Sequence, residues 1–373
     1  MPEGTATKPE PDLQLREMPR YGMREFFATR AGQTAAVLTA TAEHLGRALG
    51  ATVISAECFG PDPDGSGLYT AEPPVPPIAV PLTWVQCPTS ANGLGGCHLR
   101  AVAEAEVRPL VLDGQVVGAV VNGPYAGECI LSGIHPPDTT LAPDRQARAA
   151  YDRMEQALSL AGMDFSHVVR TWLFLDDILS WYDDFNRVRT AFFTERSVFD
   201  RLVPASTGIG AANPAGAAMV TGVYAVKSNN PDVTVQAVPS PLQCPALQYG
   251  SSFSRAVEVA MPDLRRLLIS GTASIAPDGR TQHVGDVAAQ TARTCEVIAA
   301  ILESRGMGWE DVTRATAYVR FAEDADAFER LRSAIGMPVL PVVVSQSVIC
   351  RDDLLFELEV DAVQSRPRAN AAQ

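Results

Sequence analysis

GECILSGIHPPDTTLAPDRQARAAYDRMEQALSLAGMDFSHVVRTWLFLDD, residues 127–177, has a counterpart later in the same chain. Residues 266–323, RLLISGTASIAPDGRTQHVGDVAAQTARTCEVIAAILESRGMGWEDVTRATAYVRFAE, follow the same order of features. In each copy an apolar strand ends in Ser-Gly, a turn containing Pro and Asp follows, and an amphipathic helix stops at a Gly before a β-branched strand. The chain therefore contains an internal repeat.

Both copies continue in the same way. A second helical stretch, YDDFNRVRTAFF in the first copy and DADAFERLRSAI in the second, leads to a Pro and two closing strands. This order predicts the α+β class, with two β-sheet units that each carry helices on one face. The other face of each sheet must also be covered, and we expect a second sheet to cover it.

A stretch rich in Pro, Ser and Asn, residues 228–245, separates the two copies and marks a domain boundary. We predict a flexible tail over residues 1–28 and an N-terminal domain over residues 29–235. That domain has extra N-terminal elements, beginning with a helix over residues 29–50 and a strand after it. The C-terminal domain is expected over residues 245–373.

Composition excludes several kinds of protein. The net charge of −13 disfavours nucleic acid, which needs a basic surface. The seven cysteines form no CxxC pair, so neither a disulfide framework nor a zinc site is indicated. No apolar run approaches the length of a membrane span, and the first residues lack the apolar core of a signal peptide. We therefore expect a cytoplasmic protein that does not bind nucleic acid or membranes.

The repeated pattern resembles a known family. The strand ending in Ser-Gly, the VVRTWLFLDD strand, the helix with AFF and the stretch Pro204-Ala205-Ser206-Thr207 resemble the RidA/YjgF fold, carried here twice. Two such copies ending in CRDDLLFELEVDAV are similar to the chorismatases, which cleave pyruvate from chorismate. The resemblance implies two RidA/YjgF-like (chorismate-mutase-like) units with chorismate as substrate, and it is strongest to the 3-hydroxybenzoate synthase branch.

Departures from ordinary RidA proteins narrow the function. Those enzymes deaminate imines with an arginine in a P-A-R-S-T motif, and neither copy has that arginine. The repeats also differ from each other, because the first copy has Val220 and Gly222 opposite Glu357 and Glu359. These differences weigh against an imine deaminase and favour one site per chain, on the second copy.

The last strand alternates apolar and acidic residues. Every second residue points to the same face of a strand. The apolar set is expected beneath the helices, and it consists of Leu354, Phe356, Leu358, Val360 and Ala362. Glu357, Glu359 and Asp361 share the opposite face. For Glu359 and Asp361 we expect a solvated face. Glu357 stands where the resemblance places the general acid of chorismatases. A carboxyl among apolar neighbours can stay protonated near neutral pH, which protonation of the enolpyruvyl methylene requires.

Cys350 precedes Glu357 by seven residues. A free cysteine is most often a small buried hydrophobe. The resemblance implies a further role, because the 3-hydroxybenzoate branch has a cysteine at this place. There the ring hydroxyl, rather than water, displaces the enolpyruvyl group, and the thiol assists aromatisation. Hydrolysis to a dihydroxycyclohexadiene carboxylate and formation of 4-hydroxybenzoate stay open as alternatives.

Chorismate has two carboxylates, so an acidic protein needs local cations to bind it. Arg351 and Arg320 are our candidates, with Tyr224 as a hydrogen-bond donor. Arg170 and Arg314 occupy matching positions of the two repeats, which indicates a shared scaffold role. No nucleotide or metal motif is present, and no cofactor is expected.

Other functions stay open beside chorismatase. One is a lyase or RidA-type imine deaminase that acts on another small carboxylate, and another is a ligand-binding protein without catalysis. Because RidA-type sheets usually form trimers, we expect either a monomer with internal pseudo-symmetry or a homotrimer.

Overall fold

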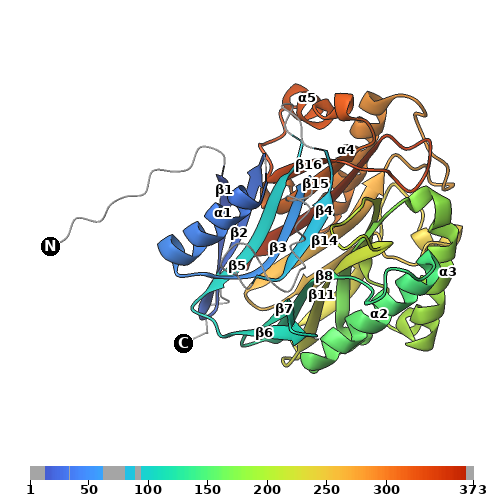
Figure 1. Cartoon of the computed structure of the whole chain (residues 1–373). Coiled ribbons are helices and arrows are strands. Elements are labelled where there is room, and N and C mark those ends of the chain that lie inside the picture. The colour runs from blue at the N-terminus through green and yellow to red at the C-terminus, as the bar shows by residue number, and fades with distance from the viewer. Residues whose placement is uncertain (1–12, 33, 62–79, 89–93, 367–373) are drawn as a thin grey trace.

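Three β-sheets surround a shared core, and the helices lie on the outside (Figure 1). The structure is a computed structural model that describes residues 13–32, 34–61, 80–88 and 94–366. The expected α+β class is confirmed, and both repeats form a sheet with two helices on one face. The third sheet, which the repeat did not predict, is built from residues before the first copy.

This N-terminal unit covers residues 13–103 and contains five strands and one helix within the described residues. Its elements are β1 (Leu13–Arg20), β2 (Met23–Ala31), α1 (Thr34–Leu49), β3 (Thr52–Gly60), β4 (Leu82–Gln86) and β5 (Gly96–Ala103). The expected tail over residues 1–28 is therefore wrong from residue 13 onward. Residues 13–31 form an antiparallel hairpin around Gly22 that buries Phe26. Residues 1–12 lie outside the described part.

The first-repeat unit covers residues 107–228 and the second-repeat unit residues 234–365. The first contains β6 (Val107–Leu112), β7 (Gln115–Asn122), β8 (Ala126–Ile134), α2 (Pro143–Leu160), β9 (Val168–Leu175), α3 (Ile178–Glu195), β10 (Ala205–Gly210) and β11 (Met219–Ser228). The second contains β12 (Thr234–Val238), β13 (Ala256–Ala260), β14 (Leu264–Ala273), α4 (Val287–Ser304), β15 (Val312–Val319), α5 (Ala327–Ala334), β16 (Val342–Gln346) and β17 (Phe356–Ser365).

The segment between the repeats is not only a linker. Residues 228–245 contain β12, which pairs with β13 at the edge of the second-repeat sheet. The second-repeat unit thus begins before residue 245. The sequence TVQAV of this strand is short and lies between residues typical of turns, Pro and Asn, so the pattern did not predict a strand here.

All three units follow the same path. In each, two antiparallel strands are followed by a helix, a strand, a parallel edge strand and a closing strand inserted at the centre. The orders β1-β2-β5-β3-β4, β7-β8-β11-β9-β10 and β13-β14-β17-β15-β16 are therefore equivalent. The N-terminal unit is a third copy of the fold whose sequence no longer resembles the repeats.

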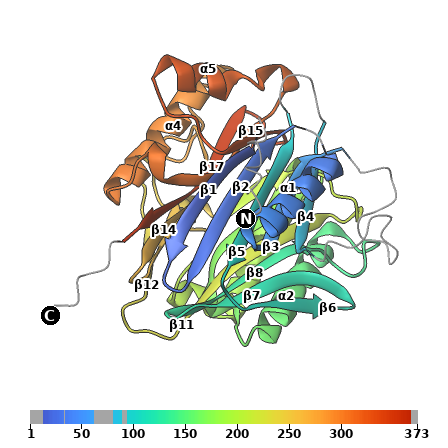
Figure 2. The ribbon, with the colours of Figure 1, turned by 90° about the vertical axis from the view of Figure 1, so that its left-hand side faces the viewer.

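The units meet in a ring around an approximate threefold axis (Figure 2). Strand β10 packs on β14, β16 packs on β2, and β4 packs on β8. Phe59, Phe174 and Tyr318 lie at matching positions of β3, β9 and β15. The ring of Phe59 lies 6.0 Å from that of Phe174 and 6.3 Å from that of Tyr318. One chain thus encloses three sheet-to-sheet interfaces.

The outer faces of the sheets are apolar and pack under the helices. Phe356, Leu358 and Val360 of β17 join the cluster beneath α4 and α5, as the alternation predicts. Each such large side chain contributes about 1.5–3 kcal/mol when fully buried. Leu354 is an exception, because it precedes β17 and packs with Phe59 near the axis instead.

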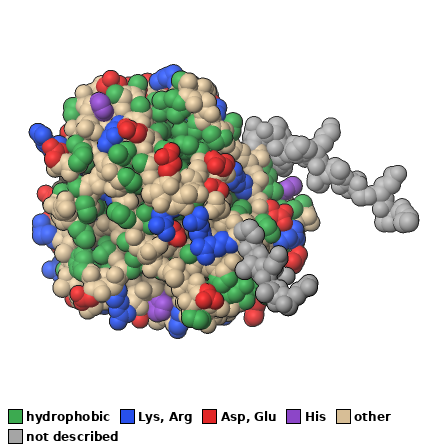
Figure 3. Space-filling view, turned by 180° about the vertical axis from the view of Figure 1, so that it is seen from behind, with side chains coloured by type: hydrophobic (Ala, Val, Ile, Leu, Met, Phe, Trp, Pro, Cys, Tyr) green, Lys and Arg blue, Asp and Glu red, His purple; other side chains and the backbone are tan. Residues whose placement is uncertain are grey.

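The surface has a mixed character. On the face opposite to that of Figure 1, apolar side chains lie scattered among acidic and basic ones (Figure 3). None of the helices in the described part of the chain combines the length and the apolar character needed to cross a membrane.

Candidate active site

A cavity of about 410 Å³ lies between the first-repeat and second-repeat units. Helix α3 and strand β10 form one wall, and β14, β17 and the loops before β13 and β17 form the other. Its volume is within the range of small-molecule sites. The lining residues are Tyr182, Asp183, Asn186, Arg189, Ser206, Gly208, Tyr249, Gly250, Ser251, Phe253, Arg255, Gly271, Ala273, Ile275, Cys350, Arg351, Leu354 and Glu357.

Three of the five residues proposed from the sequence meet in this cavity. Glu357, Cys350 and Arg351 all line it. Arg320 does not, because its guanidinium donates to the carbonyl of Arg351 at 3.0 Å and lies beside Asp352. Arg320 therefore holds the turn that presents Cys350 and Arg351. Tyr224 is also elsewhere, in a separate cavity on the threefold axis.

Glu357 lies at the start of β17, opposite Ala273 of β14 and Tyr318 of β15. Its side chain is almost fully buried. Gly271, from the Ser-Gly pair of the second repeat, faces the carboxyl, and any Cβ atom there would collide with Glu357 Oε1. The repeat motif thus leaves the space that the carboxyl occupies.

The pKa of Glu357 is raised from its usual value near 4.5 to about 8. Burial is the largest cause, and the neighbouring charge of Glu359 acts in the same direction, while the guanidinium groups of Arg170 and Arg255 partly offset both effects. Glu357 is therefore a carboxylic acid at neutral pH, able to donate a proton into the cavity.

Cys350 lies in the loop before β17 and packs against two hydrophobic clusters. One is the core of the first-repeat unit, and the other is the cluster at the axis that contains Phe59, Phe174 and Tyr318. The pKa of its thiol is raised to about 12 by burial and by the nearby Glu357, while the charge of Arg351 and a hydrogen bond with Tyr182 act in the opposite direction. The thiol is neutral under ordinary conditions. It can shape the cavity or donate a weak hydrogen bond, but it is not a thiolate nucleophile.

Three guanidinium groups face the cavity, and the sequence indicated only Arg351. Arg189 of α3 is almost fully buried, donates to Asn186 at 2.6 Å, and its Nε has no hydrogen-bond partner among the described residues. Arg255 donates twice to the carbonyl of Cys244 and lies over the ring of Tyr249. Arg351 donates to the carbonyl of Gly279 at 2.8 Å. Together they make a cationic site in an acidic protein.

The expectation of a solvated face for Glu359 and Asp361 is wrong. Glu359 is fully buried and forms ion pairs with Arg170 at 2.8 Å and Arg314 at 2.7 Å. Asp361 is also buried, and Arg314 Nη1 lies 3.6 Å from it. This face of β17 turns toward the threefold axis, where the other two sheets replace solvent. The matching arginines are thus scaffold residues, as expected, with buried acidic partners.

The ion-pair network at the axis contains five arginines and six acids. The acids are Glu25, Glu57, Glu128, Asp263, Glu359 and Asp361, and the arginines are Arg20, Arg100, Arg170, Arg266 and Arg314. Removing one member of a buried pair leaves an uncompensated charge and costs about 3–5 kcal/mol. The network therefore specifies how the three units fit together.

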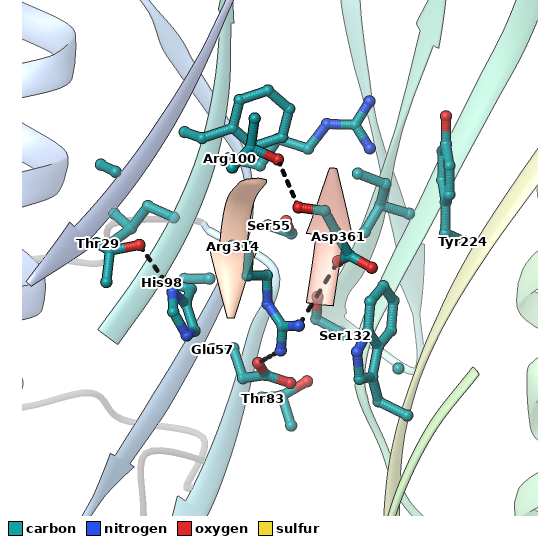
Figure 4. Close-up of a pocket in the computed structure, with 18 of the residues that line it drawn as sticks. Thr29, Ser55, Glu57, Thr83, His98, Arg100, Ser132, Tyr224, Arg314 and Asp361 are labelled. Carbon is teal, nitrogen blue, oxygen red and sulfur yellow. Dashed lines mark hydrogen bonds and ion pairs between the residues drawn. The ribbon is translucent and has the colours of Figure 1, made fainter. Parts of the chain in front are cut away.

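A second cavity, of about 80 Å³, lies within this network (Figure 4). Arg314 stands between Glu57 and Asp361, and Tyr224 points away toward the opposite wall. The Tyr224 hydroxyl donates to Glu128 at 2.6 Å. Tyr224 is therefore bound into the axial network, which separates it from the cavity of Glu357.

The two other interfaces lack an acid at the position of Glu357. The residues opposite Phe59 and Phe174 on the closing strands are Gly96 and Val220, whereas Glu357 lies opposite Tyr318. One of the three equivalent positions can therefore donate a proton. Among the described residues, no group of three or more His, Cys, Asp or Glu side chains is placed to hold a metal ion.

Comparison with known protein families gives two matches. Residues 125–222 match the family described as Chorismatase FkbO/Hyg5-like, N-terminal, and residues 246–364 match the family described as Endoribonuclease L-PSP. A crystal structure of a chorismatase aligns with 83% of this chain and 93% of its own, at a TM-score of 0.62 and 22% identity. The shared fold agrees with the expected tandem RidA/YjgF-like units.

Three curated relatives are similar to this chain. A 3-hydroxybenzoate synthase from Streptomyces hygroscopicus is 30% identical over 57% of this chain and 67% of its own length. A chorismatase from Streptomyces rapamycinicus is 31% identical over 53% of this chain and 64% of its own, and one from Streptomyces hygroscopicus is 28% identical over 52% and 60%. From the identity and coverage of the first relative, together with the family match in the first repeat, the chain belongs to the chorismatase family.

Proposed function

We propose that this protein converts chorismate to 3-hydroxybenzoate and pyruvate. The observation that carries the proposal is Glu357, a buried acid that keeps its proton at neutral pH in a cavity with three guanidinium groups. Relatives named chorismatase and 3-hydroxybenzoate synthase support the same substrate.

The first step is the transfer of the Glu357 proton to the methylene carbon of the enolpyruvyl group. The double-bond electrons form the new C–H bond, and the positive charge that develops on the adjacent carbon is shared with the ether oxygen. Carbon is a weak base, so this step needs an acid that is held protonated and close. Glu357 is that acid, because its raised pKa keeps it protonated at neutral pH. After the transfer, its carboxylate lies near the developing cation.

In the second step the neighbouring ring hydroxyl attacks the ring carbon that bears the ether oxygen. The C–O bond breaks, its electrons neutralise the cation, and pyruvate leaves, while the Glu357 carboxylate takes the hydroxyl proton. The ring ether so formed opens, a ring C–H proton is lost and the oxygen is protonated, which gives 3-hydroxybenzoate. No water is consumed, because the atoms of chorismate divide between the two products.

Cys350 favours this intramolecular route over hydrolysis. It lies beside Glu357, and its neutral thiol occupies space from which a water molecule would attack the same carbon. The hydrogen bond between Tyr182 and the thiol fixes its orientation. A weakly hydrogen-bonding thiol holds water poorly and so leaves the ring hydroxyl as the nearest nucleophile.

Two carboxylates of the substrate must be neutralised in the cavity. Arg189 and Arg255 stand on opposite walls, in α3 and in the loop before β13, and Arg351 follows Cys350. Arginine binds carboxylates with two parallel hydrogen bonds, so it also fixes orientation. Arg189 lines the cavity and forms no ion pair with an acid of the described residues, so we take it as a candidate for one carboxylate.

The test is incubation of the purified protein with chorismate, with pyruvate and ring products measured separately. We expect equal amounts of pyruvate and 3-hydroxybenzoate, and no oxygen from labelled water in the aromatic hydroxyl. A non-aromatic diol would indicate the hydrolytic route, and the absence of pyruvate would refute the proposal.

A further inference from the structure

Glu359 follows Glu357 by two residues on β17, so both side chains project from the same face of the sheet. Both are buried, yet their surroundings differ. Glu359 receives Arg170 at 2.8 Å on one oxygen and Arg314 at 2.7 Å on the other, with the Tyr318 hydroxyl at 3.1 Å. Within the described residues Glu357 forms no such ion pair. Two adjacent carboxyls are therefore held in opposite protonation states.

The asymmetry follows from charge. Burial by itself would raise the pKa of Glu359, but the guanidinium groups of Arg314 and Arg170 outweigh it and hold the pKa below its usual value. Glu359 is therefore anionic while Glu357 is neutral. Two close carboxyls in a dry site do not both ionise readily, and the one with cationic partners takes the charge.

We propose, resting on the function proposed above, that Glu359 is a positioning residue of the reaction. Its charge, held by Arg170 from the first-repeat unit and Arg314 from the second, keeps the proton on Glu357 until the substrate methylene receives it. Arg170 comes from the opposite unit of the interface, so the ion pair that it forms with Glu359 depends on packing of the two repeats.

Other titratable and charged side chains face Glu357 from the elements that pack against it. They are Arg170 on β9, Arg255 before β13, Tyr318 on β15, Tyr182, Asp183 and Arg189 on α3, and Cys350 and Arg351 before β17. Of these, Arg170 and Arg255 oppose proton retention, and the neutral tyrosines and thiol do not carry charge near pH 7. Glu359 is the acidic neighbour that raises the pKa of Glu357.

Asp361 provides a matched control. It lies two residues further along the same face, is buried, and also neighbours Arg170 and Arg314. The charged groups that shift the pKa of Glu357 are Glu359, Arg170 and Arg255. Asp361→Asn and Glu359→Gln therefore make the same kind of change in the same network, and differ in their distance along β17 from the acid.

The experiment measures the pH profile of kcat/KM for pyruvate release from chorismate. Wild type should lose activity as Glu357 ionises, with a midpoint near pH 8. Glu359→Gln should lower that midpoint by about one pH unit or more, because it removes a negative charge and leaves two arginines to favour the Glu357 anion. Above the new midpoint, the activity of Glu359→Gln should be roughly tenfold lower than that of wild type, and at pH 5.5 the two activities should be similar. Glu359→Asp, which keeps the charge, should restore most of the midpoint.

A second readout does not depend on turnover. The carbonyl stretch of the protonated Glu357 carboxyl, isolated as an infrared difference against Glu357→Gln, should disappear at lower pH in Glu359→Gln than in wild type. If the protein fails to act on chorismate, the proposed function falls while this titration still tests the role of Glu359. If Glu359→Gln does not fold, Arg314→Gln replaces it, because Arg314 is the main cation that holds the charge of Glu359; a shift of the Glu357 midpoint to lower pH is then expected.

The inference is overturned by an unchanged Glu357 midpoint in Glu359→Gln, or by an equal shift in Asp361→Asn. It is also overturned if Arg314→Gln, used as the replacement, shifts the midpoint upward or not at all. A lower maximal rate with an unmoved midpoint would assign Glu359 to packing alone.

Discussion

Gly271 on β14 and Glu357 on β17 face each other so closely that the carboxyl oxygen of Glu357 occupies the place of a side chain at residue 271. Thr207 of the neighbouring unit closes the same space, since its methyl carbon would lie 3.1 Å from that Cβ. The Gly271 N–H donates to the Thr207 hydroxyl at 3.0 Å, which fixes the backbone there. The position of the acid thus depends on the missing side chain.

Gly271→Ala is expected to displace the Glu357 carboxyl while the fold persists. The new methyl group must push away either Glu357 or Thr207, and overpacking of this kind costs about 1–3 kcal/mol. A displaced acid should lower kcat by about tenfold to a hundredfold, because proton transfer depends on distance. Pyruvate release and thermal unfolding measure the two effects.

Gly208→Ala is the control for that variant. Gly208 lines the same cavity, but a Cβ there meets nothing closer than the Tyr182 hydroxyl at 3.9 Å. This variant should retain kcat within about a factor of three. Equal losses in the two variants would show that the cavity tolerates no added atom, and would remove the special role of residue 271.

Glu357→Gln is expected to fold and to release no pyruvate, because the amide has the shape of the acid without its proton. The same variant tests the buried acid through stability. The pKa of Glu357 is raised on folding, so the folded state holds a proton that the unfolded state has lost between pH 4.5 and about 8. Within that window the wild type loses about 1.4 kcal/mol of unfolding free energy per pH unit relative to the variant.

Below pH 4.5 the carboxyl is protonated in both states, so wild type and variant should depend on pH in the same way. The measurement is urea unfolding of both proteins at pH 4.5, 6 and 7.5. A constant difference in stability across this range would mean that Glu357 is not a protonated acid in the folded protein.

Cys350→Ala is expected to change the product more than the rate. Removal of the thiol should cost about 1–2 kcal/mol of stability and admit water beside the reacting carbon. Pyruvate release should persist in part, and the ring product should shift from 3-hydroxybenzoate toward the diol. Chromatography of the products measures the ratio.

Cys295→Ala removes the same atoms from a buried site in the core beneath α4, away from the cavity. It should lower stability by a similar amount and leave the product ratio as in wild type. If both variants give the wild-type ratio, Cys350 is a packing residue and the intramolecular route has another cause.

Arg189→Gln is expected to raise KM for chorismate with little change in stability. Arg189 lines the cavity, and a charge-assisted hydrogen bond to a carboxylate contributes about 1.5–3 kcal/mol. Binding should weaken roughly tenfold to a hundredfold. Arg187→Gln, on the exposed side of the same helix and paired with Asp184, should bind as wild type does. Unchanged KM in Arg189→Gln would leave the substrate carboxylates to Arg255 and Arg351.

The local pattern of the sequence was sufficient for much of the fold. The Ser-Gly strands, the two helices of each repeat and the alternation in β17 follow from side-chain periodicity, and the structure has all of them. The resemblance to the chorismatases singled out Glu357 and Cys350, and both line one cavity. The local pattern did not identify Arg189, because the helix sequence does not distinguish this buried arginine from the exposed Arg187 two residues earlier.

The sequence by itself determined which residues of each strand share a face, because that depends only on the geometry of one strand. It could not determine what lies opposite that face. The N-terminal unit has the same strand path as the repeats without their sequence motif, and its sheet covers the axial faces of the other two sheets. Glu359 and Asp361 therefore became buried ion-pair partners instead of solvated acids. Only the packing of three sheets, which brings Arg170 and Arg314 from separate units to one carboxylate, decided which acid keeps its proton.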